Sequence, residues 1–222
     1  MSSVTGQPRL DQIAELTRGV AELPLASLPE RLLQFIADKV VYAFNDLRSR
    51  YPEVFQNGRE PEITALMESR LKSLRNEDRR WEMLVSAVVR GWESHSFDGR
   101  RLEVRPDLSI VLTDRLRDRF PLRIECKIID YPAGKTAGDY CLDGVRRYEE
   151  GDYAWANREA FMLAYVHDGS DLVTRLACRV SGLACRPGRQ DLAVSSHPRR
   201  FALPLPFGNP GNIELWHLWL SL

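Results

Sequence analysis

Two short apolar stretches decide the fold of this chain: RPDLSIVL at residues 105–112 and LRIECKII at residues 122–129. Both are rich in β-branched and aliphatic residues, which is typical of buried β-strands. Each also carries charge, with Asp107 in the first stretch and Glu125 and Lys127 in the second. Because side chains alternate between the two faces of a strand, Glu125 and Lys127 are expected on one face and Cys126 on the other.

These three charged groups need partners, because a charge that leaves water unpaired costs free energy. A divalent cation bound by Asp107 and Glu125, with Lys127 beside it, would remove that cost and bring chemistry to the site. The alternative for Lys127 is structural: its aliphatic stem follows the sheet while the ammonium reaches solvent.

The composition limits the class of protein. A length of 222 residues fits one large domain, or a core domain with a helical extension. The 31 basic and 31 acidic residues cancel, which argues against non-specific coating of nucleic acid but allows a local basic face. No apolar run is long enough to span a membrane and no signal-peptide pattern is present, so a cytoplasmic protein with no membrane partner is expected. The four cysteines lack zinc-site spacing and are expected to be reduced thiols.

Hydrophobic periodicity predicts an α/β chain. Helices are predicted at about 28–50, 60–74, 138–150 and 171–180. Strands are predicted at 94–97, 102–112, 121–129, 160–166 and 213–220, with a hairpin turn at Asp98-Gly99 and a further helix end or strand at 81–89. The short connections predict an antiparallel meander, and the later strand–helix–strand order predicts a crossover and a mixed sheet. Residues 186–211 are predicted to form an ordered loop region.

The pattern formed by Pro106-Asp107 and Glu125-Cys126-Lys127, with Glu125 following Asp107 by 18 positions, resembles the PD-(D/E)XK motif of restriction-endonuclease-like nucleases. The order of elements over residues 60–168 is similar too: a helix with an acid, a meander with the motif, then a helix and a strand. The resemblance implies a restriction-endonuclease-like core at 59–222, with a central mixed sheet flanked by helices. Residues 1–58 would form an N-terminal helical extension.

The resemblance also implies a set of roles. Asp107 and Glu125 would bind Mg²⁺, which Mn²⁺ could replace, and the backbone carbonyl of Cys126 would assist. Lys127 would position or activate the attacking water, or stabilise the charge of the transition state. Carboxylate and carbonyl oxygens are the ligands that Mg²⁺ prefers, and bound Mg²⁺ both lowers the pKa of water and acts as a Lewis acid.

A third acid is expected from the helix that begins at Glu60-Pro61-Glu62. The residues by themselves favour Glu62 as a partner of the helix dipole, since acidic groups and proline are preferred at a helix N-terminus. The resemblance instead implies that Glu62 joins the metal site, with Glu60 and Glu68 as weaker candidates.

The helix after the motif is similar to the corresponding helix of nucleases from bacterial defence systems, and this resemblance implies nucleic-acid contacts through Arg146, Arg147 and Tyr148. The alternative is that this segment is a solvated charged face. His197 and His217 could contact substrate, although a structural hydrogen bond explains either histidine more simply.

The resulting hypothesis is a Mg²⁺-dependent endodeoxyribonuclease that hydrolyses phosphodiester bonds of DNA in defence against foreign DNA. Its alternative is a nuclease-like interaction or sensor subunit of a larger defence complex, with little or no cleavage on its own. A homodimer would suit double-strand cleavage. Another kind of hydrolase is disfavoured, since the chain has neither a P-loop nor a serine nucleophile elbow.

Overall fold

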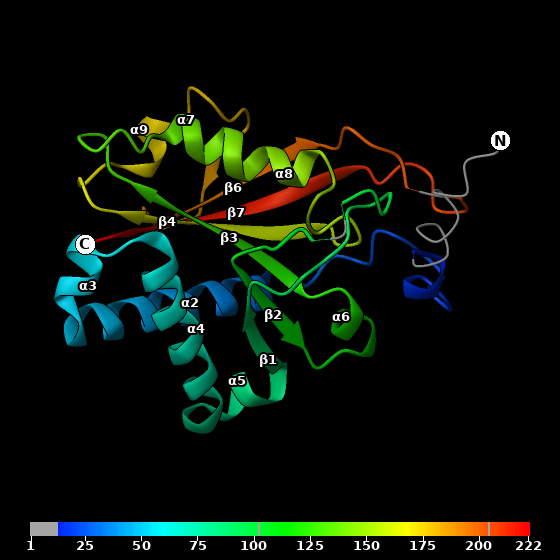
Figure 1. Cartoon of the computed structure of the whole chain (residues 1–222), viewed down its shortest axis with the longest axis horizontal. Helices are drawn as coiled ribbons and strands as arrows, with labels where there is room; N and C mark the ends of the chain where they lie inside the picture. The colour runs from blue at the N-terminus through cyan, green and yellow to red at the C-terminus, as the bar shows by residue number, and fades with distance from the viewer. Residues whose placement is uncertain (1–12, 102, 204) are drawn as a thin grey trace.

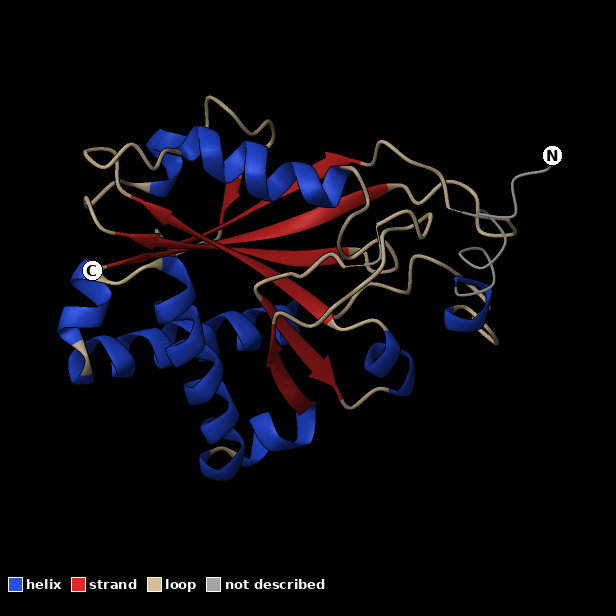
Figure 2. Cartoon of the chain, viewed as in Figure 1, coloured by secondary structure: helices blue, strands red, loops and turns tan. Residues whose placement is uncertain are grey.

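The protein is an α/β fold built on one seven-stranded mixed β-sheet with helices on both faces (Figures 1 and 2). This computed structural model describes residues 13–101, 103–203 and 205–222. Residues 1–12 of the predicted N-terminal extension, and Leu102 in the predicted strand 102–112, lie outside the described residues. The predicted fold class, a mixed sheet flanked by helices, is confirmed at this level.

The strand order across the sheet is β1-β2-β3-β4-β7-β6-β5. The strands are β1 (Val85–Arg90), β2 (Leu108–Leu112), β3 (Leu122–Ile129), β4 (Glu159–Val166), β5 (Ala184–Cys185), β6 (Leu192–Pro198) and β7 (Asn212–Ser221). β1, β2 and β3 form an antiparallel meander, in which β2 and β3 were predicted but β1, and not the segment 94–97, supplies the first strand. The parallel pair β3–β4 confirms the predicted crossover, and β4 and β7 are also parallel. The loop predicted at 186–211 was wrong over β6, because its inward-facing Ser195 and His197 conceal the apolar alternation of a strand.

The described helices flank this sheet (Figure 1). They are α2 (Glu30–Arg50), α3 (Pro52–Asn57), α4 (Glu60–Glu77), α5 (Arg79–Leu84), α6 (Arg115–Arg119), α7 (Ala137–Tyr140), the π-helical turn η1 (Cys141–Val145), α8 (Arg146–Glu149) and α9 (Leu172–Leu176). The helical run α7–η1–α8 matches the helix predicted at 138–150. It lies very close to the sheet at Gly144, where an added Cβ would be 2.3 Å from Met162 Cε.

Each face of the sheet has its own core. On one face, α2 and α4 bury apolar side chains such as Phe44 and Met67 against strand residues such as Cys126 and Tyr165. On the other face, α7–η1–α8 and α9 cover residues such as Met162. Full burial of a large apolar side chain contributes about 1.5–3 kcal/mol. Because α2 shares its core with α4 and the sheet, the predicted boundary at residue 58 does not separate two cores.

The segment before β2 is less regular than predicted. Regular pairing starts at Leu108, two residues after Pro106, which has no N–H to donate to a ladder. The predicted hairpin at Asp98-Gly99 is a turn flanked by a single bridge between Ser94 and Val104. Among the described residues, no helix is both long and apolar enough to cross a membrane.

Candidate active site

The site forms where β2 separates from β3. Pairing between the two strands ends at Ile124, and the next two backbone N–H groups on that edge of β3 turn to carboxylates instead. The N–H of Cys126 donates to Asp107 Oδ2 at 2.7 Å, and the N–H of Ile128 donates to Glu60 Oε2 at 3.3 Å. Buried backbone N–H groups need hydrogen-bond partners. Because β2 no longer pairs with β3 beyond Ile124, the carboxylates of Asp107 and Glu60 replace the missing strand partners and are held at this point.

Lys127 joins the acids together. Its Nζ donates to Glu125 Oε1 at 2.9 Å and to the Cys126 carbonyl at 2.8 Å, and lies 3.7 Å from Glu60 Oε1. The Cys126 side chain lies on the opposite face and contacts Tyr165, so the predicted alternation along β3 is confirmed. The structure therefore brings Asp107, Glu125, Lys127 and the carbonyl of Cys126 to one place.

Of the acids at the site, Glu125 has the least favourable surroundings for a negative charge. It is 1% exposed, and its Oε1 also accepts from Arg147 Nη1 at 3.1 Å. Its Oε2 is buried with no hydrogen-bond partner. Burial, and then the charge of Asp107, raise the pKa of Glu125 to about 8, because the opposing effects of Lys127 and Arg147 are smaller.

At the two neighbouring acids, burial also has a larger effect on the pKa than the nearby positive charge. Burial raises the pKa of Asp107 and of Glu60 above their ordinary values, although Lys127 acts in the opposite direction on both. Burial would lower the pKa of Lys127, but Glu125, Glu60 and Asp107 together raise it. Lys127 therefore stays charged at neutral pH while the three acids compete for positive charge.

The third acid at the site is Glu60, and the structure does not bring Glu62 there. The carboxylate of Glu62 accepts from the backbone N–H of Arg59 at 2.8 Å and pairs with its guanidinium, with the side chain 47% exposed. Two residues turn the chain by about 200° around a helix axis, so Glu60 and Glu62 face opposite ways. Glu68 lies elsewhere on α4, bonded to Lys72. The helix-dipole interpretation of Glu62 agrees with its position, and the structure adds that Glu62 forms a capping box with Arg59.

Of the three residues expected to contact nucleic acid, only Arg147 reaches the site. Its Nη1 also donates to Tyr153 Oη at 2.6 Å, and its side chain is 42% exposed. Arg146 is exposed and bonded to Glu150. Tyr148 is fully buried and donates to the Phe161 carbonyl, so its predicted contact with nucleic acid is wrong. Its ring faces the sheet because this helix packs closely over β4.

Both histidines singled out in the sequence belong to a buried hydrogen-bond relay. Tyr140 Oη lies 2.9 Å from His217 Nδ1, and Ser195 Oγ lies 2.7 Å from both His217 Nε2 and His197 Nε2. His197 Nδ1 then lies 3.0 Å from Glu149 Oε1. Burial lowers the pKa of both histidines, that of His217 to about 3. Ser195 is 2% exposed, so this arrangement supports packing and does not present a nucleophile.

The donor set at the site is of the kind that hard cations take. Among the described residues, no three His, Cys, Asp or Glu side chains are grouped to hold a metal ion. A cation would therefore use the two carboxylates Asp107 and Glu125 together with the Cys126 carbonyl. Oxygen donors of this type fit Mg²⁺ or Mn²⁺, and the unpartnered Glu125 Oε2 is the atom that such an ion would satisfy.

The site opens to the surface beside Lys127. A cavity of about 430 Å³ there is lined by Glu60, Lys127, Lys135 and Tyr140, among others. Sequence reasoning ranked Glu60 below Glu62 and overlooked Arg123. The alternation of side chains along a strand could have drawn attention to Arg123, because Arg123 lies in the same apolar strand as Glu125 and Lys127 and on the same face.

The chain matches no protein-family model, no curated protein and no solved structure. Its resemblance to restriction-endonuclease-like nucleases therefore rests on the motif residues and on the order of its elements.

Proposed function

We propose that this chain is a metal-dependent nuclease of the PD-(D/E)XK type that hydrolyses phosphodiester bonds of DNA. The observation that carries the proposal is the meeting of Asp107, Glu125 and Lys127 at the open edge of β3, with one buried carboxylate oxygen left unpartnered. The position of Glu60, hydrogen-bonded to Ile128 and near Lys127, supports it as the helix-borne acid that the resemblance implies.

Each residue of the site has its own role in the proposed hydrolysis. Mg²⁺, held by Asp107, Glu125 and the Cys126 carbonyl, would supply Lewis acidity and a bound water of lowered pKa. Lys127 keeps its proton at neutral pH, so its role is to orient the attacking water and to stabilise negative charge on the phosphoryl oxygens. Arg147, with a partly exposed guanidinium above Glu125, would bind a phosphate of the substrate.

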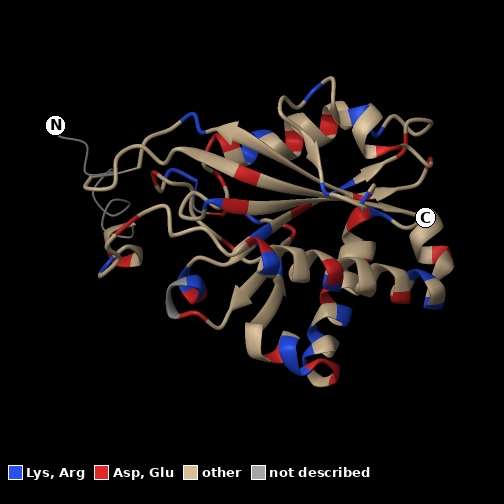
Figure 3. Ribbon diagram, turned by 180° about the vertical axis from the view of Figure 1, so that it is seen from behind, with Lys and Arg blue, Asp and Glu red and all other residues tan. Residues whose placement is uncertain are grey.

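The charge distribution favours substrate binding by a few positive groups close to the site. Figure 3 shows acidic and basic residues interspersed along the ribbon, and the net charge is zero. Non-specific DNA affinity depends on phosphate neutralisation, so the positive groups that matter are those around the site: Lys127, Lys135 and Arg147.

The test is incubation of the purified protein with plasmid, linear and single-stranded DNA, with and without Mg²⁺ or Mn²⁺. Lys127→Ala should fold normally and lose cleavage, whereas the control Lys72→Ala, which removes an exposed lysine of α4, should keep it. Full activity of Lys127→Ala in Mg²⁺ would refute the mechanism. Calorimetry provides a second readout: Asp107→Ala and Glu125→Ala should each abolish Mg²⁺ binding.

One observation favours a second candidate, a nuclease-like subunit that acts within a defence complex. Glu125 Oε1 is already paired with both Lys127 and Arg147, so two side-chain cations partly supply the charge that a metal would bring. Folded wild-type protein that binds neither Mg²⁺ nor Mn²⁺ and cuts none of the three DNA substrates would favour this second function.

A further inference from the structure

A second feature lies on the same face of the sheet as the candidate active site. Arg123 precedes Glu125 by two residues in β3, so their side chains share a face and their Cα atoms are about 7 Å apart along the strand. Arg123 lines a cavity of about 290 Å³ that is separate from the opening beside Lys127. This volume is just below the range for drug-sized ligand sites, about 300–1,000 Å³, and suits a small ligand.

Arg123 is unusual among the buried arginines. Among the described residues three arginines are buried, and two of them have carboxylate partners. Arg70 pairs with Asp46 and Glu77, and Arg117 pairs with Glu159.

Arg123, at 7% exposed, has no carboxylate partner in the described part of the chain. It donates to Ser109 Oγ and lies 5.8 Å from the centre of the Trp92 ring. Burial lowers the pKa of Arg123 to about 10, so the guanidinium remains charged at neutral pH. A buried cation with unused donors beside a cavity favours an anionic ligand.

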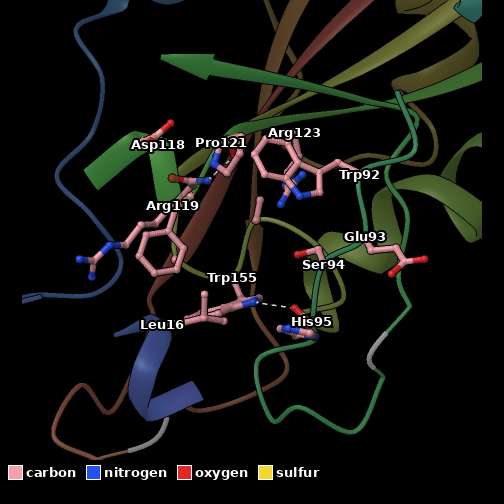
Figure 4. Close-up of a pocket in the computed structure, with 14 residues that line it drawn as sticks. Leu16, Trp92, Glu93, Ser94, His95, Asp118, Arg119, Pro121, Arg123 and Trp155 are labelled. Atoms are coloured by element: carbon pink, nitrogen blue, oxygen red, sulfur yellow. Dashed lines mark hydrogen bonds between the residues drawn. The ribbon is translucent and has the colours of Figure 1, made fainter. Parts of the chain in front are cut away.

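The cavity wall includes the aromatic residues Trp92, Phe120 and Trp155. In Figure 4, Trp92 and Arg123 lie along one side of the space, and Leu16 and Trp155 lie along the other. Trp155 is held in place by its Nε1, which donates to the His95 carbonyl at 2.8 Å. Trp92 is 39% exposed, so part of its ring is free to stack on a ligand.

The acidic residues at the rim do not oppose an anion strongly. Glu93 is ion-paired with Arg105, and Asp118 is followed in α6 by Arg119, which also lines the cavity. A phosphate in the cavity would therefore meet Arg119 as well as the two acidic residues, and Arg123 is the one buried arginine without a carboxylate partner among the described residues.

We propose that this cavity binds one unpaired nucleotide of a nucleic-acid strand, with its phosphate on Arg123 and its base against Trp92. A flat aromatic surface beside a guanidinium recognises a base and its phosphate together, and stacking accepts every base. The adjacent Glu125 makes this nucleotide a neighbour of the phosphodiester that is cut, a placement that rests on the proposed function. The preferred substrate class is then DNA with unpaired nucleotides: single strands, frayed ends or flaps.

The test measures binding without cleavage. Tryptophan fluorescence of the wild-type protein in EDTA is titrated with thymidine 5′-monophosphate, thymidine and inorganic phosphate. The monophosphate should quench fluorescence and bind at least about tenfold more tightly than either fragment, since it alone makes both contacts. Arg123→Gln and Trp92→Leu should each weaken it by about tenfold, whereas Arg100→Gln, at an exposed arginine of the same loop region, should not.

The outcomes separate this proposal from the nuclease proposal. Lys127→Ala should bind the monophosphate as the wild type does, even though it is expected to lose cleavage. Equal binding of phosphate and monophosphate would reduce the cavity to a simple anion site, and equal binding of thymidine would remove the role of Arg123. Either result, or no binding at all, would overturn the proposal. Should Arg123→Gln fail to fold, the partly exposed Trp92→Leu decides.

Discussion

Replacing Glu125 with glutamine should stabilise the metal-free protein at neutral pH while abolishing its proposed activity. Glutamine keeps an oxygen acceptor for Lys127 and Arg147 but removes a charge that burial disfavours. The pKa of Glu125 is about 8 in the folded state, compared with 4.5 for an ordinary glutamate. Folding therefore favours the protonated form, and its stabilising effect is complete below pH 4.5 and is lost as the pH rises toward 8.

The magnitude follows from this difference in pKa. At pH 7 the pH exceeds the unfolded-state pKa of Glu125 by about 2.5 units, and each unit is worth about 1.4 kcal/mol. The free energy of unfolding of the wild type is therefore lower at pH 7 than at pH 4.5 by about 3 kcal/mol, a loss that Glu125→Gln does not undergo. For a protein of this length, that difference corresponds to a rise in melting temperature of roughly 6–12 °C.

The assay is thermal unfolding in EDTA, followed by circular dichroism at pH 4.5 and at pH 7, with Glu53→Gln as a control at an exposed glutamate of α3. The wild type and Glu125→Gln should have similar melting temperatures at pH 4.5, and Glu125→Gln should have the higher melting temperature at pH 7. A difference in melting temperature that is the same at both pH values would refute the assignment of Glu125 as a destabilising buried acid.

Three further predictions concern the surroundings of the site. Glu60→Gln should reduce cleavage by at least about tenfold in an initial-rate assay, because it changes an acid held beside Lys127; Glu62→Gln should keep the rate and lose only some helix stability. Arg147→Gln should raise Mn²⁺ affinity by about tenfold in calorimetry, since it removes a cation that competes for Glu125, and unchanged affinity would contradict that competition. His217 has a folded pKa of about 3, lowered by burial, so wild-type stability should be complete above pH 6.5 and fall by about 2 kcal/mol by pH 5. Urea unfolding of His217→Gln should show a flatter pH dependence, and an unaltered slope would argue against this role.

The sequence by itself determined the features that depend on local pattern. The β-branched runs predicted β2 and β3, and the alternation of side chains placed Glu125 and Lys127 together on one face, away from Cys126. The 3.6-residue period predicted α2 and α4, and the short connections predicted the meander. These features follow from neighbours in the chain, whose geometry is fixed by the backbone.

Contacts between distant segments were decided only by the tertiary structure. Whether Glu60 or Glu62 reaches the site depends on how α4 is rotated against β3, and the hydrogen bond from the N–H of Ile128 to Glu60 shows which of the two does so. Tyr148 is buried because the helix approaches β4 closely. The cavity beside Arg123 exists because segments distant in the sequence, which supply Leu16, Trp92 and Trp155, meet around it, while Arg123 itself has no carboxylate partner among the described residues. Burial and missing partners are properties of the packed chain, so no local pattern could reveal them.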